Sequence, residues 1–526
     1  MNNAPLRSPF LFGGHSLVTA FGAVSSAIRS VLSPIVPLLV LSLFFLVSCH
    51  DEEILTDTGS QPTFELNNGS TQHLGVLFPG RTTSTQKLLL YNRNDGTLKL
   101  ESLVLRGGEE SLFRINVDGM AGTSFTDPDF LRIAKGDSLH VLLEASFFGQ
   151  QEEREAEYED YIDILCNGRQ TSIRLAVKVK NVEELHNDTI RQDTLWASGG
   201  VDKLIYGPLV IPEGVTLTVD SGMTLFMHDQ AGIKVNGSLR LLGSQEKPVR
   251  IIGDRTDSIF SNLAYVDMSA QWVGIFIHEK STANLFDHAE IMGMTFGITL
   301  GQDSLSEEQA EATPQLTIRN SLIKNSDASL INASATTMVI ENSLLMNSGN
   351  DLLTLWGGAY DITHCTLANY QFWTAYPPYD LTLSNYAFVS DSIDVHAVPV
   401  HSPLYRCNIT NTIIYGNGSS AANVNIDYDG GDLFGTMALH DSIFHYRFDH
   451  CLIRANGEDD DDFISTVWNE DPMFQLVDMP NYICDPHLLP ESPAVGKGNP
   501  STLLRLPLDK DGRPRQNPPS IGCYEP

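Results

Sequence analysis

The sequence is poor in basic residues, with 33 lysines and arginines against 65 aspartates and glutamates and a formal net charge of −32. A chain this acidic repels the phosphates of nucleic acids, and no basic cluster offsets the repulsion. We therefore expect no nucleic-acid partner. The sequence also lacks the motifs of serine hydrolases, P-loop enzymes, dinucleotide-binding enzymes and zinc proteases. It therefore predicts no catalytic residue and no cofactor.

Long apolar runs are scarce as well. The run that includes residues 38–47 is shorter than the roughly 20 residues of a membrane-spanning helix, and it has the length of a signal-peptide core. The segment before it carries Arg7 and Arg29 and no acid, and Cys49 follows directly after the small Ser48. We interpret residues 1–48 as an export signal.

The residues "LVSC" that end at Cys49 resemble the lipobox of bacterial lipoproteins, and the "HDEE" after them resembles the acidic tether of Bacteroidota-type surface lipoproteins. The resemblance implies that Cys49 becomes the lipidated N-terminus. It also implies an outer-membrane protein that is anchored by its lipid and faces the cell surface, with residues 49–62 as a tether. An ordinary signal peptide with a chance cysteine is the alternative.

Cysteine is sparse, with seven in the chain and six after Cys49. These six do not cluster at metal-ligand spacings, and an exported chain permits disulfides.

Residues 63–180 predict a β-sandwich of about seven strands, because short alternating runs are separated by turn signals. "QKLLLYN" and "LKLESLVL" flank Asn94-Asp95-Gly96, a hairpin-type turn, and a second pair of strands is joined around Asn167-Gly168. "GDSLHVLLEASF" is another strand, and Cys166 is expected to be a buried free thiol. The pattern is similar to immunoglobulin-like modules of the abnormal-spindle type. Residues 181–200 are interpreted as a linker.

From residue 201 onward one pattern returns: an apolar residue, any residue, Asn or His, a small residue, any residue and an aliphatic residue. The copies are "FDHAEI" at 286, "IRNSLI" at 318, "IENSLL" at 340, "ITHCTL" at 362, "ITNTII" at 409 and "FDHCLI" at 448. The three starts at 318, 340 and 362 are 22 residues apart. A fixed period of this size indicates a solenoid, here of parallel strands. Residues 201–470 resemble right-handed parallel β-helix proteins.

Two slots of this repeat contain residues that could be mistaken for catalytic groups. The third slot holds His288, Asn320, Asn342, His364, Asn411 and His450. Because histidine and asparagine alternate from coil to coil, we interpret the slot as a hydrogen-bonding ladder at a turn. Cys365 and Cys451 fill the next slot, which elsewhere holds a small residue, so we expect them to be packing residues.

Four segments near the end, "DPMF" at 471, "LLPESPAVGKG" at 488, "DKDGRPR" at 509 and "IGCYE" at 521, resemble a module that closes β-helices in many bacterial surface proteins (choice-of-anchor Q-like). The resemblance covers residues 471–526. That module usually has alanine where this chain has Cys523, and Cys484 lies in the same module. A disulfide between these two cysteines, which would restrain the fraying end of a solenoid, is one alternative, and two free thiols are the other.

Two insertions between repeats are candidate sites. "IDYDGGD" supplies Asp427, Asp429 and Asp432, and residues 458–462 form a second acidic run. β-Helix enzymes such as pectate lyases and polygalacturonases place acids on such loops for Ca²⁺ binding or acid–base catalysis. Their Asn-Thr-Asp, Gly-His-Gly and Arg-Ile-Lys motifs are absent. We interpret both loops as solvated, with Ca²⁺ binding at the three aspartates as the alternative.

The other insertion, residues 370–388, is rich in aromatic side chains: Tyr370, Phe372, Trp373, Tyr376 and Tyr379. Such rings stack on sugars, and the alternative is that they pack the loop onto the helix wall. We therefore predict a non-enzymatic surface protein that binds a glycan, or a partner or host protein, along its β-helix. The rival hypothesis is a polysaccharide lyase or glycoside hydrolase with a diverged site. Exposed aromatics without converging acids would favour binding, and carboxylates converging with an arginine or lysine would favour an enzyme.

Overall fold

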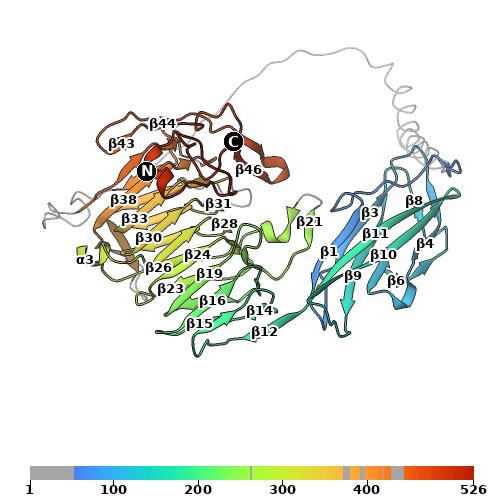
Figure 1. The fold of residues 1–526 in the computed structure, drawn as a ribbon. Helices are drawn as coiled ribbons and strands as arrows, with labels where there is room; N and C mark the ends of the chain where they lie inside the picture. The colour runs from blue at the N-terminus through green and yellow to red at the C-terminus, as the bar shows by residue number, and fades with distance from the viewer. Residues whose placement is uncertain (1–52, 261–262, 371–378, 391–396, 419, 428–442) are drawn as a thin grey trace, which may run out of the picture.

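The fold is all-β (Figure 1). The computed structural model describes residues 53–260, 263–370, 379–390, 397–418, 420–427 and 443–526. A β-sandwich comes first, a stack of parallel coils follows, and the C-terminal segment from residue 471 packs on the coils. Within these ranges no helix is long and apolar enough to span a membrane.

The sandwich packs two sheets face to face, as expected from its alternating strands. In the described residues one sheet has the order β1 (Thr71–Leu77), β11 (Arg169–Lys180), β10 (Glu155–Cys166), β4 (Leu98–Leu105) and β7 (Ser124–Phe125), with β8 (Arg132–Ile133) also on β4. The other has the order β2 (Arg81–Thr82), β9 (Ser138–Phe147), β5 (Phe113–Val117) and β6 (Met120–Gly122), with β3 (Gln86–Tyr91) also on β9. Their inner faces meet in one buried cluster.

One of the two predicted hairpins is confirmed and the other is wrong. Asn167 and Gly168 have φ of 50° and 73° and join β10 to β11, as a two-residue hairpin turn requires. The segment 94–96 does not join a hairpin, because β3 pairs with β9 and β4 pairs with β10. The segment crosses between the sheets instead, and the Asn92 side chain stabilises it by donating to the Gly96 carbonyl at 2.8 Å.

The tether expected at residues 49–62 is wrong for residues 53–62, which are held on the sandwich. The Leu55 amide donates to the Thr97 carbonyl at 2.9 Å, and the Gln61 side chain donates to the Cys166 carbonyl at 2.8 Å. Polar side chains suggested a solvated segment, but here they bind the backbone of the sandwich. Residues 49–52 lie outside the described part of the chain.

Three parallel sheets form the coils, and their counts refer to the described residues. The eleven-stranded sheet has the order β12 (Val182–His186), β14 (Asp202–Tyr206), β17 (Thr224–Met227), β20 (Val249–Gly253), β25 (Ala289–Met294), β28 (Leu322–Ser326), β31 (Leu344–Ser348), β34 (Thr366–Ala368), β39 (Ile413–Ile414), β42 (Leu452–Ile453) and β44 (Val467–Trp468). The ten-stranded sheet has the order β13 (Thr194–Trp196), β16 (Thr216–Asp220), β19 (Ser238–Leu242), β24 (Asn284–Asp287), β27 (Leu316–Arg319), β30 (Thr337–Glu341), β33 (Gly358–Thr363), β38 (Leu404–Thr410), β41 (Arg447–Asp449) and β43 (Phe463–Ile464). The eight-stranded sheet has the order β15 (Pro208–Ile211), β18 (Gly232–Val235), β23 (Gly274–Ile277), β26 (Ile298–Gly301), β29 (Ile331–Ser334), β32 (Leu353–Trp356), β35 (Leu381–Ser384) and β40 (Val424–Asp427).

Smaller elements lie between and beyond the coils. They are the hairpins β21 (Ser258–Phe260) with β22 (Leu263–Ala264), β36 (Tyr386–Ser390) with β37 (Ala397–His401) and β45 (Phe474–Asp478) with β46 (Ile483–Leu488), the short helix α3 (Glu307–Ala310), and the 3₁₀ turns η1 (Gly108–Glu110), η2 (Tyr265–Asp267), η3 (Met479–Asn481) and η4 (Pro500–Leu504).

The 22-residue repeat places equivalent apolar residues above one another inside the coils. Ile318 pairs with Ile340, which pairs with Ile362, and all three are at most 1% exposed. Each coil therefore buries its apolar side on its neighbours, as a solenoid requires.

The predicted linker at residues 181–200 is wrong. β12 and β13 lie in this segment, and each is the first strand of one of the large sheets. The solenoid thus begins directly after the sandwich. The mistake has a physical reason, since β12 is an edge strand whose residues are half-buried or exposed, which makes its sequence read as polar.

The third repeat slot is confirmed as a turn ladder between the ten-stranded and eleven-stranded sheets. Its six residues have φ between 49° and 53°, a left-handed conformation that asparagine and histidine adopt more readily than most residues. Each backbone amide donates to a carbonyl of the next coil, as from Asn342 to Thr363 at 2.9 Å and from His364 to Thr410 at 3.0 Å.

The outer face of the eleven-stranded sheet is apolar and is covered along most of its length. Phe78 of the sandwich packs on Leu204, Phe226 and Ile252 in the first coils. Later outward residues of the sheet, such as Leu344 and Met346, pack under the C-terminal segment, including Phe474, Ile521 and Tyr524. On the ten-stranded sheet, Ala310 of α3 packs with Ala359 and Tyr405. Among the described residues, cavities lie on the outer faces of this sheet and of the eight-stranded sheet.

Candidate functional site

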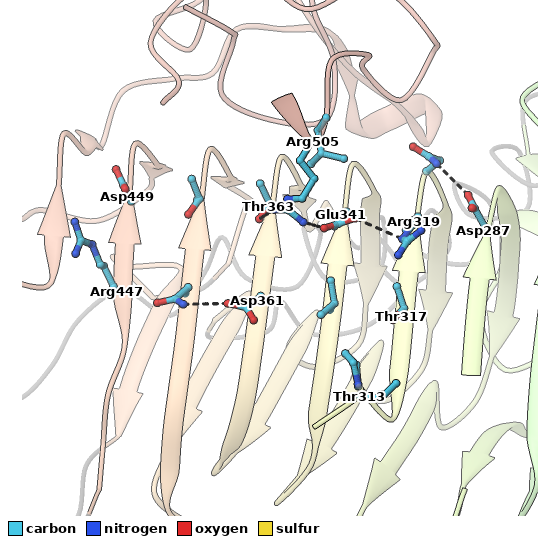
Figure 2. Close-up of a pocket in the computed structure, with 16 residues that line it drawn as sticks. Asp287, Thr313, Thr317, Arg319, Glu341, Asp361, Thr363, Arg447, Asp449 and Arg505 are labelled. Atoms are coloured by element: carbon cyan, nitrogen blue, oxygen red, sulfur yellow. Dashed lines mark hydrogen bonds and ion pairs between the residues drawn. The ribbon is translucent and has the colours of Figure 1, made fainter. Parts of the chain in front are cut away.

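A cavity of about 1010 Å³ lies on the outer face of the ten-stranded sheet, beside the C-terminal segment (Figure 2). Its side chains stand in two rows, because parallel strands in register bring outward residues of successive coils side by side at about 4.8 Å. One row runs Thr317, Val339, Asp361, Asn408 and Arg447, and the other runs Asp287, Arg319, Glu341, Thr363, Thr410 and Asp449. We call this cavity the groove.

The groove brings carboxylates and arginines together, the feature that would favour an enzyme. Arg505 reaches from the C-terminal segment over the sheet and contacts Glu341 and, at 3.2 Å, the Thr363 hydroxyl (Figure 2). Arg319 lies 3.5 Å from the other side of Glu341. Burial lowers the pKa of Arg505, and the neighbouring Arg319 lowers it further. Glu341 is therefore held between two arginines.

The remaining carboxylates of the groove also have partners. Asp361 accepts hydrogen bonds from Arg406 at 3.2 Å and Asn408 at 3.0 Å. Asp449 lies 2.5 Å from His450 Nδ1 and accepts from Asn499 at 3.1 Å.

Asp287 has His288 Nδ1 at 2.8 Å and accepts from the Asn320 amide at 3.0 Å. Burial alone would raise the pKa of Asp287, but the hydrogen bonds of His288 and Asn320 outweigh burial and lower it. A general acid needs a raised pKa, so Asp287 is unsuited to that role. The carboxylates of the groove thus serve as contacts within the protein.

The turn ladder beside the groove is the surface on which the C-terminal segment docks. His364 is completely buried, with its Nε2 2.8 Å from the Thr502 hydroxyl. Asn411 donates to the Asn499 carbonyl at 3.1 Å and accepts from the Asn499 amide at 2.6 Å. Burial lowers the pKa of His364 well below its usual value, and the charge of Arg515 adds to this effect. His364 is therefore a neutral docking residue. Sequence reasoning found the ladder but not this second role.

A second cavity, of about 450 Å³, lies on the outer face of the eight-stranded sheet, and we call it the hollow. Two small residues lie in the same row as Trp356, because Gly301 is in register with Ser334, which is in register with Trp356. Thr299 and Asn332 lie in the neighbouring row, which also contains Phe276. The hollow therefore combines aromatic side chains with hydroxyl and amide groups.

Glycine keeps the backbone after Trp356 in place. Gly357 has a φ of 64°, and a Cβ at this residue would lie 2.1 Å from the Ser402 hydroxyl oxygen. The same hydroxyl donates to the Trp356 carbonyl at 3.0 Å. Ser402 therefore packs closely against Gly357 and holds the Trp356 carbonyl.

No protein-family model matches the chain, and no curated protein sequence matches it. Solved structures match in parts. The A-module of mannuronan C-5 epimerase AlgE6 from Azotobacter vinelandii is 10% identical with a TM-score of 0.28, over 55% of this chain and 89% of that chain. The PapD-like domain 7 of human CEP192 is 13% identical with a TM-score of 0.16, over 26% of this chain and 96% of that one. The Vibrio cholerae protease VesB is 14% identical with a TM-score of 0.16, over 24% of this chain and 33% of that one, so only a third of its length is matched.

The structure places the predicted aromatic site only in part. The prediction of ligand contact is wrong for Tyr370, which is 8% exposed and packs edge-on against Phe474 with 6.3 Å between ring centroids. Tyr370 packs in the apolar cluster between the solenoid and the C-terminal segment. Tyr379 is half-buried. Phe372, Trp373 and Tyr376 lie outside the described residues, so their role stays a prediction.

Of the three aspartates considered for Ca²⁺ binding, Asp427 lies in the described part of the chain. Asp427 is exposed at the end of β40 and accepts a hydrogen bond from the Tyr386 hydroxyl at 2.5 Å. Asp429 and Asp432 lie outside the described part of the chain. Within that part no group of three His, Cys, Asp or Glu side chains could hold a metal ion.

The disulfide alternative for Cys484 and Cys523 is wrong, since both are free thiols in the structure. Cys523 is fully buried on the eleven-stranded sheet, where its amide donates to the Thr366 hydroxyl at 3.1 Å, and Cys484 lies half-buried in β46. They share an apolar cluster without being bonded. Burial raises the pKa of Cys523 to about 11 and that of Cys484 to about 12. Cys166 is a buried free thiol, as expected.

Proposed function

We propose that this protein binds a glycan in the hollow on the outer face of the eight-stranded sheet. The observation that carries the proposal is the placement of Trp356 beside the small residues Gly301 and Ser334, with Asn332 and Thr299 alongside. A sugar ring presents an apolar face of C–H groups and an edge of hydroxyls. An indole suits the first, and amide and hydroxyl side chains suit the second.

The size of the hollow supports a ligand of this kind. Its volume of about 450 Å³ is within the range of small-molecule sites, roughly 300–1,000 Å³. A protein partner would instead need a larger complementary surface of about 800 Å² on each side. We therefore favour a glycan over a partner or host protein as the ligand.

Glycoside hydrolysis is the second candidate function, because Glu279 and Asp303 also line the hollow. Two carboxylates are the minimum for a hydrolase. A lyase is less well supported, since neither lysine nor arginine is among the lining residues.

The test is a glycan array with the purified protein, followed by mass spectrometry of the bound glycans after incubation. We expect binding without cleavage. Trp356→Ala should weaken binding at least about tenfold, which corresponds to 1.4 kcal/mol. Asn332→Ala should weaken it as well. Phe296→Ala is the matched control, because Phe296 is 53% exposed and does not line the hollow.

Equal binding by the Trp356 and Phe296 variants would reject the hollow as the site. Shortened glycans that disappear with Glu279→Gln or Asp303→Asn would instead assign hydrolysis. Melting temperatures of all variants are needed, because a loss of stability that explains the binding defect would leave Trp356 a packing residue.

We propose further that Cys49 carries a lipid that anchors the protein at the outer membrane, facing the cell surface. The residues that support this are "LVSC" and the acidic run after it. A fatty-acid probe should label cells that make the wild-type protein but not Cys49→Ala, with Cys166→Ala as a control that retains the label. Equal labelling of all three would refute the anchor.

A further inference from the structure

We propose that the groove on the ten-stranded sheet is a second binding site, which takes a carboxylate or sulfate group of an acidic ligand between Arg447 and Arg505. It lies on a different sheet face from the hollow, so its test is independent of the glycan proposal.

The carboxylates of the groove have partners within the protein, and their side chains are less exposed than those of the arginines. The Glu341 side chain is 8% exposed, while Arg319 and Arg505, which contact it, are 48% and 54% exposed. A ligand that enters the groove beside this trio therefore meets guanidinium groups before it meets the carboxylate. Guanidinium groups bind carboxylate and sulfate oxygens through pairs of N–H donors.

Arg447 differs from Arg319 and Arg505, which both contact Glu341. It is exposed on β41, and its side chain makes no hydrogen bond or ion pair with any residue that the structure describes. Asp449 stands two residues away on the same strand, but His450 and Asn499 already bind it. The guanidinium N–H groups of Arg447 are therefore available to donate hydrogen bonds to a ligand.

Neutral polar groups stand between the two arginines. Arg505 lies over Thr363 on β33, and Arg447 lies on β41, with only β38 between these strands. Two strand spacings separate β33 from β41 by roughly 10 Å. Thr410 and Asn408 face outward from β38 in that interval. A ligand bound by both arginines would thus lie over a hydroxyl and an amide, which suits an acidic group flanked by hydroxyls.

An anion-binding site is unexpected on this protein, because the chain as a whole carries a net charge of −32. Distant acids repel an anion, but charges beyond about 8 Å are largely screened at 0.15 M salt. Within the groove, the four carboxylates already have partners in the protein, so the more exposed arginines are the groups that a ligand meets. The probes must therefore be compared at one ionic strength.

The experiment titrates the purified protein with sodium sulfate and with trisodium citrate at constant ionic strength, by calorimetry and by thermal shift. We expect Arg447→Gln to weaken binding of at least one probe about tenfold. Arg240→Gln is the matched control, because Arg240 stands on the same sheet and in the same outward row but does not line the groove. Stronger binding of citrate than of sulfate would assign a carboxylate ligand, and the reverse would assign a sulfated one.

Sulfate also stabilises proteins by exclusion from their surface, without a site. A thermal shift that is equal in wild type, Arg447→Gln and Arg240→Gln, together with no calorimetric binding, would overturn the proposal. Both variants change exposed or half-buried side chains on the open face, so we expect both to fold. Their unchanged melting temperature without probe is the check.

Discussion

Arg515 donates a hydrogen bond of 2.6 Å to the Asn342 side-chain oxygen, joining the end of the chain to a turn 173 residues earlier. The Arg515 side chain is completely buried, and it also donates to the Cys523 carbonyl at 3.3 Å and lies 3.4 Å from Glu525. Glu525 in turn accepts from the amide and hydroxyl of Ser520. The C-terminal segment thus buries a guanidinium group whose terminal nitrogens have partners, although Arg515 Nε has none among the described residues.

We expect Arg515→Met to lower the free energy of unfolding by about 3–5 kcal/mol, because it leaves the Glu525 carboxylate buried without its cation. Arg513→Met is the control. Arg513 is 53% exposed and lies 3.7 Å from Asp511, and exposed pairs contribute only about 0–1 kcal/mol. Urea denaturation measures both variants. Equal losses in the two would show that Arg515 does not hold the segment on the ladder.

A double-mutant cycle isolates the Arg515–Asn342 contact. Asn342→Gly removes the side chain and tolerates the φ of 53° at this turn. We expect the free energies of unfolding lost in Arg515→Met and in Asn342→Gly to add up to about 1–3 kcal/mol more than the loss in the double variant. Additive losses would mean that the two residues act separately.

His364→Asn should change how stability depends on pH. The folded pKa of His364 lies well below the usual 6.5, so the unfolded chain takes up a proton more readily than the folded one. Stability from this group is complete above about pH 6.5 and is lost as pH falls from there toward the folded pKa, at about 1.4 kcal/mol per unit. Asparagine suits the turn but loses the contact with Thr502, so the variant should be less stable at pH 8 and should lose less on acidification.

The measurement compares urea denaturation of wild type and His364→Asn at pH 8 and pH 5. His186→Asn is the control, because the His186 side chain is 60% exposed. If the difference between wild type and His364→Asn were the same at both pH values, a neutral buried histidine would be ruled out.

Asp380→Asn should stabilise the protein at neutral pH. Asp380 is fully buried, and neither carboxylate oxygen has a hydrogen-bond partner in the described structure. Burial raises its pKa well above the usual value, and Asp351 in the neighbouring coil raises it further. Burial also raises the pKa of Asp351 to about 6. The stability from both groups is complete below about pH 3.8 and is lost as pH rises through about 6 and beyond.

We expect Asp380→Asn to raise the free energy of unfolding at pH 8 by about 1–3 kcal/mol and to change it little near pH 4. Asp461→Asn, at an exposed aspartate, should have no effect at either pH. A destabilised Asp380→Asn at pH 8 would indicate that the carboxylate has a role that its contacts do not reveal.

The thiols should react slowly in the folded protein. Five of the six described cysteines are buried, and burial raises the pKa of Cys166 to about 11 and that of Cys451 to about 12. Because the thiolate is the reactive form, iodoacetamide at pH 8 should modify half-buried Cys484 first and all six only after denaturation. Reductant should leave the melting temperature unchanged. A peptide that joined Cys484 to Cys523 in a non-reduced digest would contradict the structure.

The coils were predictable wherever the repeat was uninterrupted. Between residues 318 and 368 the constant spacing fixes the register, and Ile340 pairs with Ile362 as the period demands. Insertions remove that information. Gly301 pairs with Ser334 although 33 residues separate them, so the small residues of the hollow could not be aligned from sequence.

The sequence did not indicate the position of Arg447 in the groove or the contact between Arg515 and Asn342. Arg447 pairs with Asn408 across an insertion, which hid its place in the groove. The contact between Arg515 and Asn342 arises from docking of two surfaces, and neither residue type nor spacing indicates it. Sequence reasoning therefore predicted the local turn of the ladder, where asparagine and histidine adopt the left-handed conformation, and missed what the ladder binds.

The docked C-terminal segment changes how the solenoid should come apart. In a bare solenoid each coil contacts only its neighbours, so coils can open one at a time from an end. Here one segment touches the turns at Asn342, His364 and Asn411, which belong to three successive coils. None of these coils can open without releasing the segment, and the segment cannot leave without exposing the outer face of the eleven-stranded sheet. The second half of the solenoid should therefore open as a single cooperative unit, with amide protons that exchange together and not coil by coil.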